Sequence, residues 1–150
     1  DGGPCSVGVE STIIDCTGAN PKILRPGAIT IEDIKSVTGL EVDSPAHSDI
    51  RVSGSLENHY APRAQVILDQ SPQPGDGFIA LAEIPTPPGV IRLAAPKSIE
   101  AFAHDLYAAL RKADLKEIKR VVVAQPQGYG IAIAIRDRLI RAAAGRVLHD

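Results

Sequence analysis

The clearest pattern of apolar and polar positions lies in the second half of the chain. Four short, mostly apolar runs are bounded by turn-forming residues, and they predict strands over residues 65–68, 78–82, 90–93 and 120–124. The runs are nearly continuous rather than alternating, as in strands of a sheet that is covered on both faces. We therefore expect a parallel or mixed sheet in this half of the chain.

Two helices are predicted around the last of these strands. Ser98 is a suitable N-cap for a helix to about residue 112, whose apolar residues share one face: Ile99, Phe102, Leu106 and Leu110. A second helix is predicted over residues 130–144, ended by Gly145. Together these elements indicate a small α/β domain over residues 64–150.

Residues 1–42 show a weaker pattern. Residues 11–14 are β-prone, and residues 22–24 predict a second short strand. Thr30 can cap a helix that reaches about Val37, and Gly39 can end it. Two strands and one helix cannot bury a core of their own. We therefore expect this segment to be the end of a domain that lies upstream, and the chain to be a piece of a longer protein.

Residues 43–63 are expected to form a linker, because serine, glycine and proline interrupt any helical or strand periodicity there. Within it, His59 and Tyr60 can stack on a nucleotide or hydrogen-bond to it. A histidine and a tyrosine in a loop also serve often as a packing contact between domains. Spacing alone does not decide between these two roles.

Composition narrows the classes of partner. The chain has 150 residues and a net charge of −2, which gives no general attraction to nucleic acid or to anionic membranes. Its apolar runs are too short to cross a bilayer, and no signal peptide is recognisable at its start. We expect a cytoplasmic protein without a membrane partner.

Residues 7–15 and 24–27 carry the first candidate chemistry. Ser11 and Thr12 would point to opposite faces of a strand, so only one hydroxyl can face a given ligand. Arg25 precedes a proline and offers a fork of donors suited to phosphate or carboxylate. The alternative is that the hydroxyls serve packing and that Arg25 forms a surface ion pair.

These motifs carry a resemblance to a known family. Residues 1–3, 7–13 and 24–27 resemble the closing motifs of the YrdC-type catalytic domain. Residues 53–54 and 59–62 resemble the linker of long-form, two-domain L-threonylcarbamoyladenylate synthases. Residues 109–114, 128–130 and 137–143 resemble the accessory C-terminal domain of the same long form. The resemblance spans the chain in the family's order.

The resemblance implies an α/β architecture: the truncated end of an α+β YrdC-type domain, a linker, and a small Rossmann-like three-layer α/β domain. It implies a nucleotidyltransferase that condenses L-threonine, bicarbonate and ATP into threonylcarbamoyl-AMP and pyrophosphate, with Mg²⁺ on the phosphates. The product would supply a threonylcarbamoyl transferase complex that modifies tRNA. By similarity, Ser11 or Thr12 would contact threonine, and Arg25, His59 and Tyr60 would bind ATP. The chain alone is expected to be inactive, and no residue of it is predicted to bind a metal.

Two features leave other functions open. Residues 127–130 follow a strand and open a helix, as phosphate-binding loops do, although glycines there also allow a tight turn. The last helix carries a set of arginines that could form a basic face: Arg136, Arg138, Arg141 and Arg146. Such a face would suit an RNA-binding or translation-associated module, but it would also suit a solvated helix surface. The chain could also be an interaction domain without chemistry of its own.

Overall fold

The computed structural model describes residues 7–43 and 62–144. Its elements follow the chain in the order β1 (Ile13–Asp15), β2 (Lys22–Arg25), α1 (Ile31–Thr38), β3 (Gln65–Leu68), β4 (Gly77–Ile79), β5 (Ile91–Ala94), α2 (Ile99–Leu115), β6 (Arg120–Val123) and α3 (Ile131–Ala144). The α/β class is confirmed, and each strand and helix expected within the described residues is present. The expected linker falls largely outside them.

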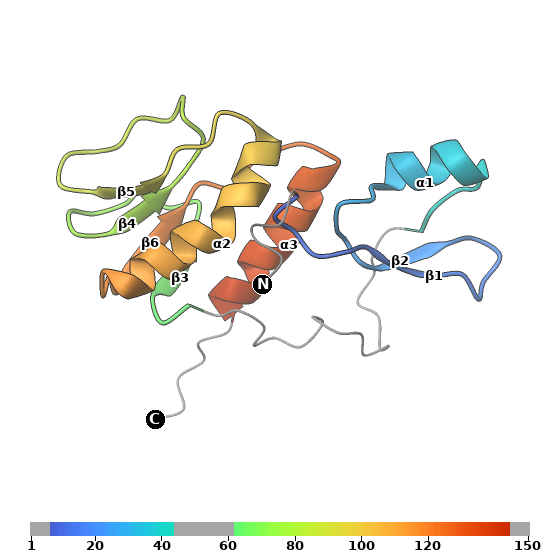
Figure 1. Ribbon diagram of the computed structural model, residues 1–150, viewed down its shortest axis with the longest axis horizontal. Helices are drawn as coiled ribbons and strands as arrows, with labels where there is room; N and C mark the ends of the chain where they lie inside the picture. The colour runs from blue at the N-terminus through green and yellow to red at the C-terminus, as the bar shows by residue number, and fades with distance from the viewer. Residues whose placement is uncertain (1–6, 44–61, 145–150) are drawn as a thin grey trace.

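Residues 62–144 form a four-stranded parallel sheet with two helices. The strand order is β3-β6-β4-β5, and β6 pairs with β3 on one side and β4 on the other. Helix α2 connects β5 to β6, and α3 follows β6 and lies against β3. Both helices lie on the same side of the sheet (Figure 1).

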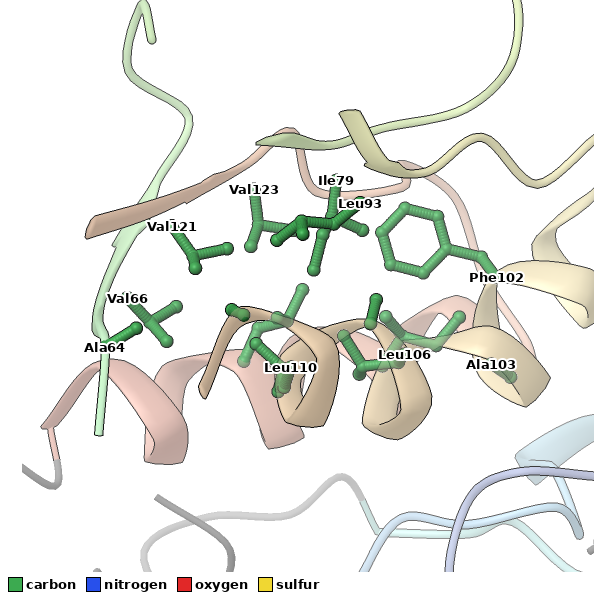
Figure 2. Packing of buried hydrophobic residues seen from close by; sticks show 14 of the residues in the cluster. Ala64, Val66, Ile79, Leu93, Phe102, Ala103, Leu106, Leu110, Val121 and Val123 are labelled. Carbon is green, nitrogen blue, oxygen red and sulfur yellow. The ribbon is translucent and has the colours of Figure 1, made fainter. Parts of the chain in front are cut away.

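The main core lies between the sheet and α2 and α3. Side chains that alternate along the strands point toward the helices, and Phe102, Leu106 and Leu110 of α2 meet them (Figure 2). Those sheet residues are Val66, Ile79, Leu93, Val121 and Val123. The helical residues match the face that the sequence predicts.

Residues 80–90 cover the other face of the sheet. Phe78, Ala80 and Val122 are buried there, with Ile84 and Val90 packed against them. Parallel crossovers are right-handed, so connections that run in opposite directions along a sheet pass over opposite faces. The β4–β5 loop and helix α2 run in opposite directions along the strand order. Both faces are therefore covered as expected, one by helices and the other by a loop.

Arg92 connects this loop to the sheet through hydrogen bonds and a contact with an aromatic ring. Its guanidinium lies 5.0 Å from the centre of the Phe78 ring, and burial lowers its pKa from the ordinary value. An arginine remains cationic at neutral pH even so. The guanidinium donates hydrogen bonds to the carbonyl oxygens of Ala80, Leu81, Ile84 and Ala94 and to the Thr86 hydroxyl.

Residues 7–43 form a second region beside α3, on the side away from the four-stranded sheet (Figure 1). Strands β1 and β2 pair in antiparallel fashion. Helix α1 starts with a capping box, in which Thr30 and Asp33 bond each other's backbone N–H, and it ends at Gly39 with φ 68°. Val7, Val9 and Ala28 pack into the core cluster of residues 62–144. The two regions therefore share part of one core.

Candidate functional site

Residues 10–12 and the turn after β2 lie in direct backbone contact. A Cβ at Gly27 would lie 2.3 Å from the Glu10 carbonyl oxygen and 2.5 Å from the Thr12 nitrogen, closer than any side chain tolerates. Glycine is therefore required at this position for steric reasons. The close approach places Arg25, two residues earlier, beside Ser11.

The guanidinium of Arg25 is buried and held at three points. Its Nε donates to the Ser11 carbonyl oxygen at 3.0 Å, and its Nη2 donates to the Ser11 hydroxyl at 3.1 Å. Its Nη1 lies 3.0 Å from Oε2 of Glu10. Only 8% of Arg25 is exposed, so water screens this arrangement weakly. The predicted alternative of a surface ion pair does not describe Arg25, because its ion pair is largely buried.

The two neighbouring hydroxyls have different surroundings. Thr12 Oγ1 donates to the Ile29 carbonyl oxygen at 2.7 Å and accepts from the Ile29 nitrogen at 3.0 Å. This hydroxyl therefore fixes the turn before α1. The Ser11 hydroxyl instead lies beside the Arg25 guanidinium. Of the two residues proposed to contact threonine, Ser11 is the one next to the fixed positive charge.

Arg138 of α3 joins the same cluster. It is 6% exposed, and its Nη2 donates to Oε2 of Glu10, the oxygen that also faces Arg25. The sequence analysis left Arg138 either on a basic face or on a solvated helix surface, and it did not single out Glu10. The available signal was helical spacing, because Arg138 follows the buried residues Ala134 and Ile135 on one face of α3.

The other arginines of α3 are also engaged within the protein. Arg136 donates to the carbonyl oxygens of Pro126 and Gly128, and Arg141 pairs with Asp137 one helical turn away. Arg146 lies outside the described residues. The guanidiniums that the basic-face interpretation requires are thus directed toward intramolecular partners in the described part of α3.

The loop before α3 has the geometry of a tight turn. Gly128 and Gly130 have φ values of 105° and 64°, which glycine adopts without strain. Arg136 holds two of the loop's carbonyl oxygens. The glycines of this loop therefore have a structural reason that does not involve phosphate.

Two predicted site residues, His59 and Tyr60, lie outside the described residues. Within residues 7–43 and 62–144, no group of three or more His, Cys, Asp or Glu side chains could hold a metal ion. In the same ranges, every helix is too short or too polar to traverse a lipid bilayer. A small apolar pocket of about 60 Å³ lies where the two regions meet, lined by residues that include Ile29, Thr30 and Gly130.

Comparison with known proteins identifies the family. The model of the family described as threonylcarbamoyl-AMP synthase, C-terminal domain, matches residues 29–144. The chain belongs to this family. The resemblance recognised in the sequence is therefore confirmed at the level of the family.

Relatives of this synthase family match nearly the whole chain. The Bacillus subtilis threonylcarbamoyl-AMP synthase is 33% identical over 174 residues, which cover 99% of this chain and 49% of that protein. The Pyrococcus abyssi synthase is 30% identical over 168 residues, again 99% of this chain and 49% of that protein. The chain thus spans about half the length of these relatives.

A solved structure of the same family supports the fold. The crystal structure of P. abyssi Sua5 complexed with L-threonine superposes with a TM-score of 0.72 at 26% identity, over 97% of this chain and 49% of that one. The arrangement of strands and helices described above is therefore the family's arrangement.

Proposed function

We propose that this chain is the C-terminal part of a nucleotidyltransferase that converts L-threonine, bicarbonate and ATP into threonylcarbamoyl-AMP and pyrophosphate. Membership of the synthase family supports this product, and the relative crystallised with L-threonine supports threonine as a substrate. We further propose a cytoplasmic role in tRNA threonylcarbamoyladenosine formation, with a transferase complex downstream. Since the chain spans about half of its relatives, it should be inactive alone.

The proposed organisation follows the sequence motifs. Residues 1–42 would close a YrdC-type catalytic domain, residues 43–63 would form the linker, and residues 64–150 would form the accessory domain. The catalytic contribution of this chain then comes from its first region. Residues 7–43 contain the motifs on which the proposed contacts with substrates rest.

The proposal rests on the three contacts that fix the guanidinium of Arg25. A buried guanidinium whose orientation is fixed by Ser11 and Glu10 is a preorganised donor for an anion. Phosphate oxygens match the fork of N–H groups on arginine. We therefore assign Arg25 to the binding of ATP phosphates.

The reaction itself needs positioning and charge stabilisation more than a protein nucleophile. The amine of L-threonine and bicarbonate first give the carbamate, N-carboxythreonine, with loss of water. An oxygen of the carbamate group then forms a bond to the α-phosphorus of ATP, and the bond from that phosphorus to the oxygen that bridges to the β-phosphate breaks. The electron pair leaves with pyrophosphate. A fixed cation such as Arg25 stabilises the negative charge that develops on the phosphate oxygens. Mg²⁺ would be carried by the nucleotide phosphates, as the resemblance to the family implies.

The remaining site residues keep narrower roles in the proposal. Ser11 is the better candidate for the threonine contact, because the Thr12 hydroxyl is already bonded in both directions to the backbone of Ile29. His59 and Tyr60 are proposed as nucleotide contacts on the basis of the sequence resemblance alone. Burial of the mixed anhydride away from water would protect it from hydrolysis.

Pyrophosphate release in the full-length protein tests this function. We expect release that depends on threonine, bicarbonate and ATP together, and a loss of about 100-fold or more in kcat/KM on Arg25→Ala. Arg25→Lys should recover part of the activity, since it keeps the charge but loses the fork. The 150-residue chain alone should release none.

An exposed arginine provides the matched control. Arg111 lies on the exposed face of α2, so Arg111→Ala should leave kcat/KM unchanged. Thermal unfolding of each variant separates loss of chemistry from loss of fold. Pyrophosphate release that does not depend on threonine, or full activity of Arg25→Ala, would contradict the proposal.

A further inference from the structure

The two regions of the protein are joined through one carboxylate oxygen. Oε2 of Glu10 lies 3.0 Å from Nη1 of Arg25 and accepts a hydrogen bond from Nη2 of Arg138. In the first region, Glu10 precedes β1 and Arg25 is the last residue of β2, whereas Arg138 lies in the middle of α3. The proposed nucleotide contact is thus one side chain away from the accessory domain.

Burial makes this connection strong. The side chains of Arg138 and Arg25 are 5% and 9% exposed, and that of Glu10 is 26% exposed. Interactions between charges in such surroundings are screened far less than on the surface. A change at one guanidinium therefore alters the position and the energy of the shared carboxylate.

Apart from Glu10, the guanidinium of Arg138 has few interaction partners in the described part of the chain. Among the described residues, its Nε has no hydrogen-bond partner, and its Nη1 lies 3.8 Å from Asp137. Asp137 is bound more closely by Arg141, at 3.0 Å. Burial of a charged pair contributes little net stability compared with apolar residues of the same size. The principal interaction of the Arg138 charge is therefore with Glu10.

A backbone contact also fixes the position of the two regions relative to each other near this carboxylate. A Cβ at Gly8 would lie 2.2 Å from Cα of His104, so the segment that leads to Glu10 rests directly on helix α2. Such a close contact limits how far the backbone next to Glu10 can move away from α2. The carboxylate of Glu10 then faces two guanidiniums, that of Arg138 from α3 and that of Arg25 from β2.

We propose that Arg138 is a positioning residue of the nucleotide site: it orients Glu10, and Glu10 orients Arg25 for the phosphates of ATP. The accessory domain thereby sets nucleotide affinity without touching the nucleotide. This inference rests on the proposed function, in which Arg25 binds ATP.

Steady-state kinetics of the full-length protein test the inference. Arg138→Met keeps an unbranched apolar stem and removes the guanidinium with its charge. We expect kcat/KM for ATP to fall about 3- to 30-fold, through a raised KM for ATP and a lowered kcat, with the KM for threonine unchanged. Arg138→Lys should restore part of the affinity. In a Glu10→Gln background, Arg138→Met should have a much smaller effect, because its partner is already altered.

The controls separate this inference from the proposed function. Arg111→Met, on the exposed face of α2, should leave every constant unchanged. If the wild type is active and Arg138→Met has the same KM for ATP as the wild type, the inference is overturned but the proposed function stands. Equal rises in both KM values with a lowered Tm also overturn it, since they indicate a purely structural role. A wild type without threonine-dependent pyrophosphate release overturns both proposals.

Discussion

The two described regions are stabilised in different ways. Residues 62–144 enclose a core of their own, in which sheet and helices bury long apolar side chains. Within residues 7–43, the buried apolar residues are Val9, Ile23 and Ile34 with two prolines, Pro21 and Pro26, and Val9 belongs to the core of the other region. The first region therefore depends on contacts outside itself, whereas the second supplies its own.

The largest expected effect comes from a core substitution in the second region, on which the first region depends. Phe102 is fully buried in α2, and Phe102→Ala should lower the free energy of unfolding by about 3–5 kcal/mol. Since Val7 and Val9 pack against the same cluster, amides in residues 7–43 should lose protection together with those of residues 62–144. Denaturant unfolding and peptide-level hydrogen exchange measure both changes.

An exposed residue of the same helix is the control for Phe102. Leu115 is 86% exposed, so Leu115→Ala should change the free energy of unfolding by less than about 0.5 kcal/mol. If residues 7–43 keep full protection in Phe102→Ala, the first region is stable without the shared core. The comparison between the two regions would then be wrong.

A smaller effect is expected from the contact between the regions. Gly8 has φ 77°, and a Cβ there would overlap the backbone of Ala103 and His104. Gly8→Ala should weaken docking by about 1–3 kcal/mol, since overpacking forces backbone shifts. Hydrogen exchange should increase in residues 7–43 while residues 62–144 keep their protection.

A substitution at Gly39 is the control that distinguishes backbone strain from the steric clash expected at Gly8. Gly39 has a similar φ of 68°, but an added Cβ would meet nothing within 4 Å. Gly39→Ala should therefore show the strain alone and a smaller loss of protection. Equal effects of the two substitutions would mean that the contact with α2 contributes nothing.

The same contrast explains what the sequence could predict of the fold. Periodicity located the strands and helices of residues 62–144, because each buries its apolar face against its neighbours. The bounds differ where a tertiary contact decides them. Strand β4 ends at Ile79 rather than near residue 82, because the carbonyl oxygens of Ala80 and Leu81 accept hydrogen bonds from Arg92. Helix α2 continues to Leu115, since no helix breaker intervenes.

The candidate site was predictable only in part. The motifs singled out Ser11 and Arg25 as separate candidates, and the structure places the hydroxyl of one 3.1 Å from the guanidinium of the other. The bridge from Glu10 to Arg138 joins residues far apart in the chain, and no local pattern specifies such a pair. The role of Gly27 was equally hidden, because its reason is a backbone contact with residues 10–12.

The smallest expected effect concerns the part of the first region that local contacts stabilise. The backbone N–H and the hydroxyl of Thr30 bond the Asp33 carboxylate and hold its pKa below the ordinary value near 3.8. A lowered folded pKa means that this contribution is complete above the unfolded pKa and is lost as pH falls through the folded one. Asp33→Asn should therefore lower the urea midpoint of residues 7–43 at pH 7, and the difference from wild type should vanish at acid pH.

Glu32→Gln gives the matched comparison for Asp33, because it removes a charge from the same helical turn without altering the capping box. If both variants show the same pH dependence, the effect reflects the helix dipole and not the bonds from Thr30. If only Asp33→Asn shows the acid-sensitive difference, the start of α1 is stabilised within residues 7–43. The capping box would then stabilise α1 locally, whereas Val7, Val9 and Ala28 rely on the core of residues 62–144.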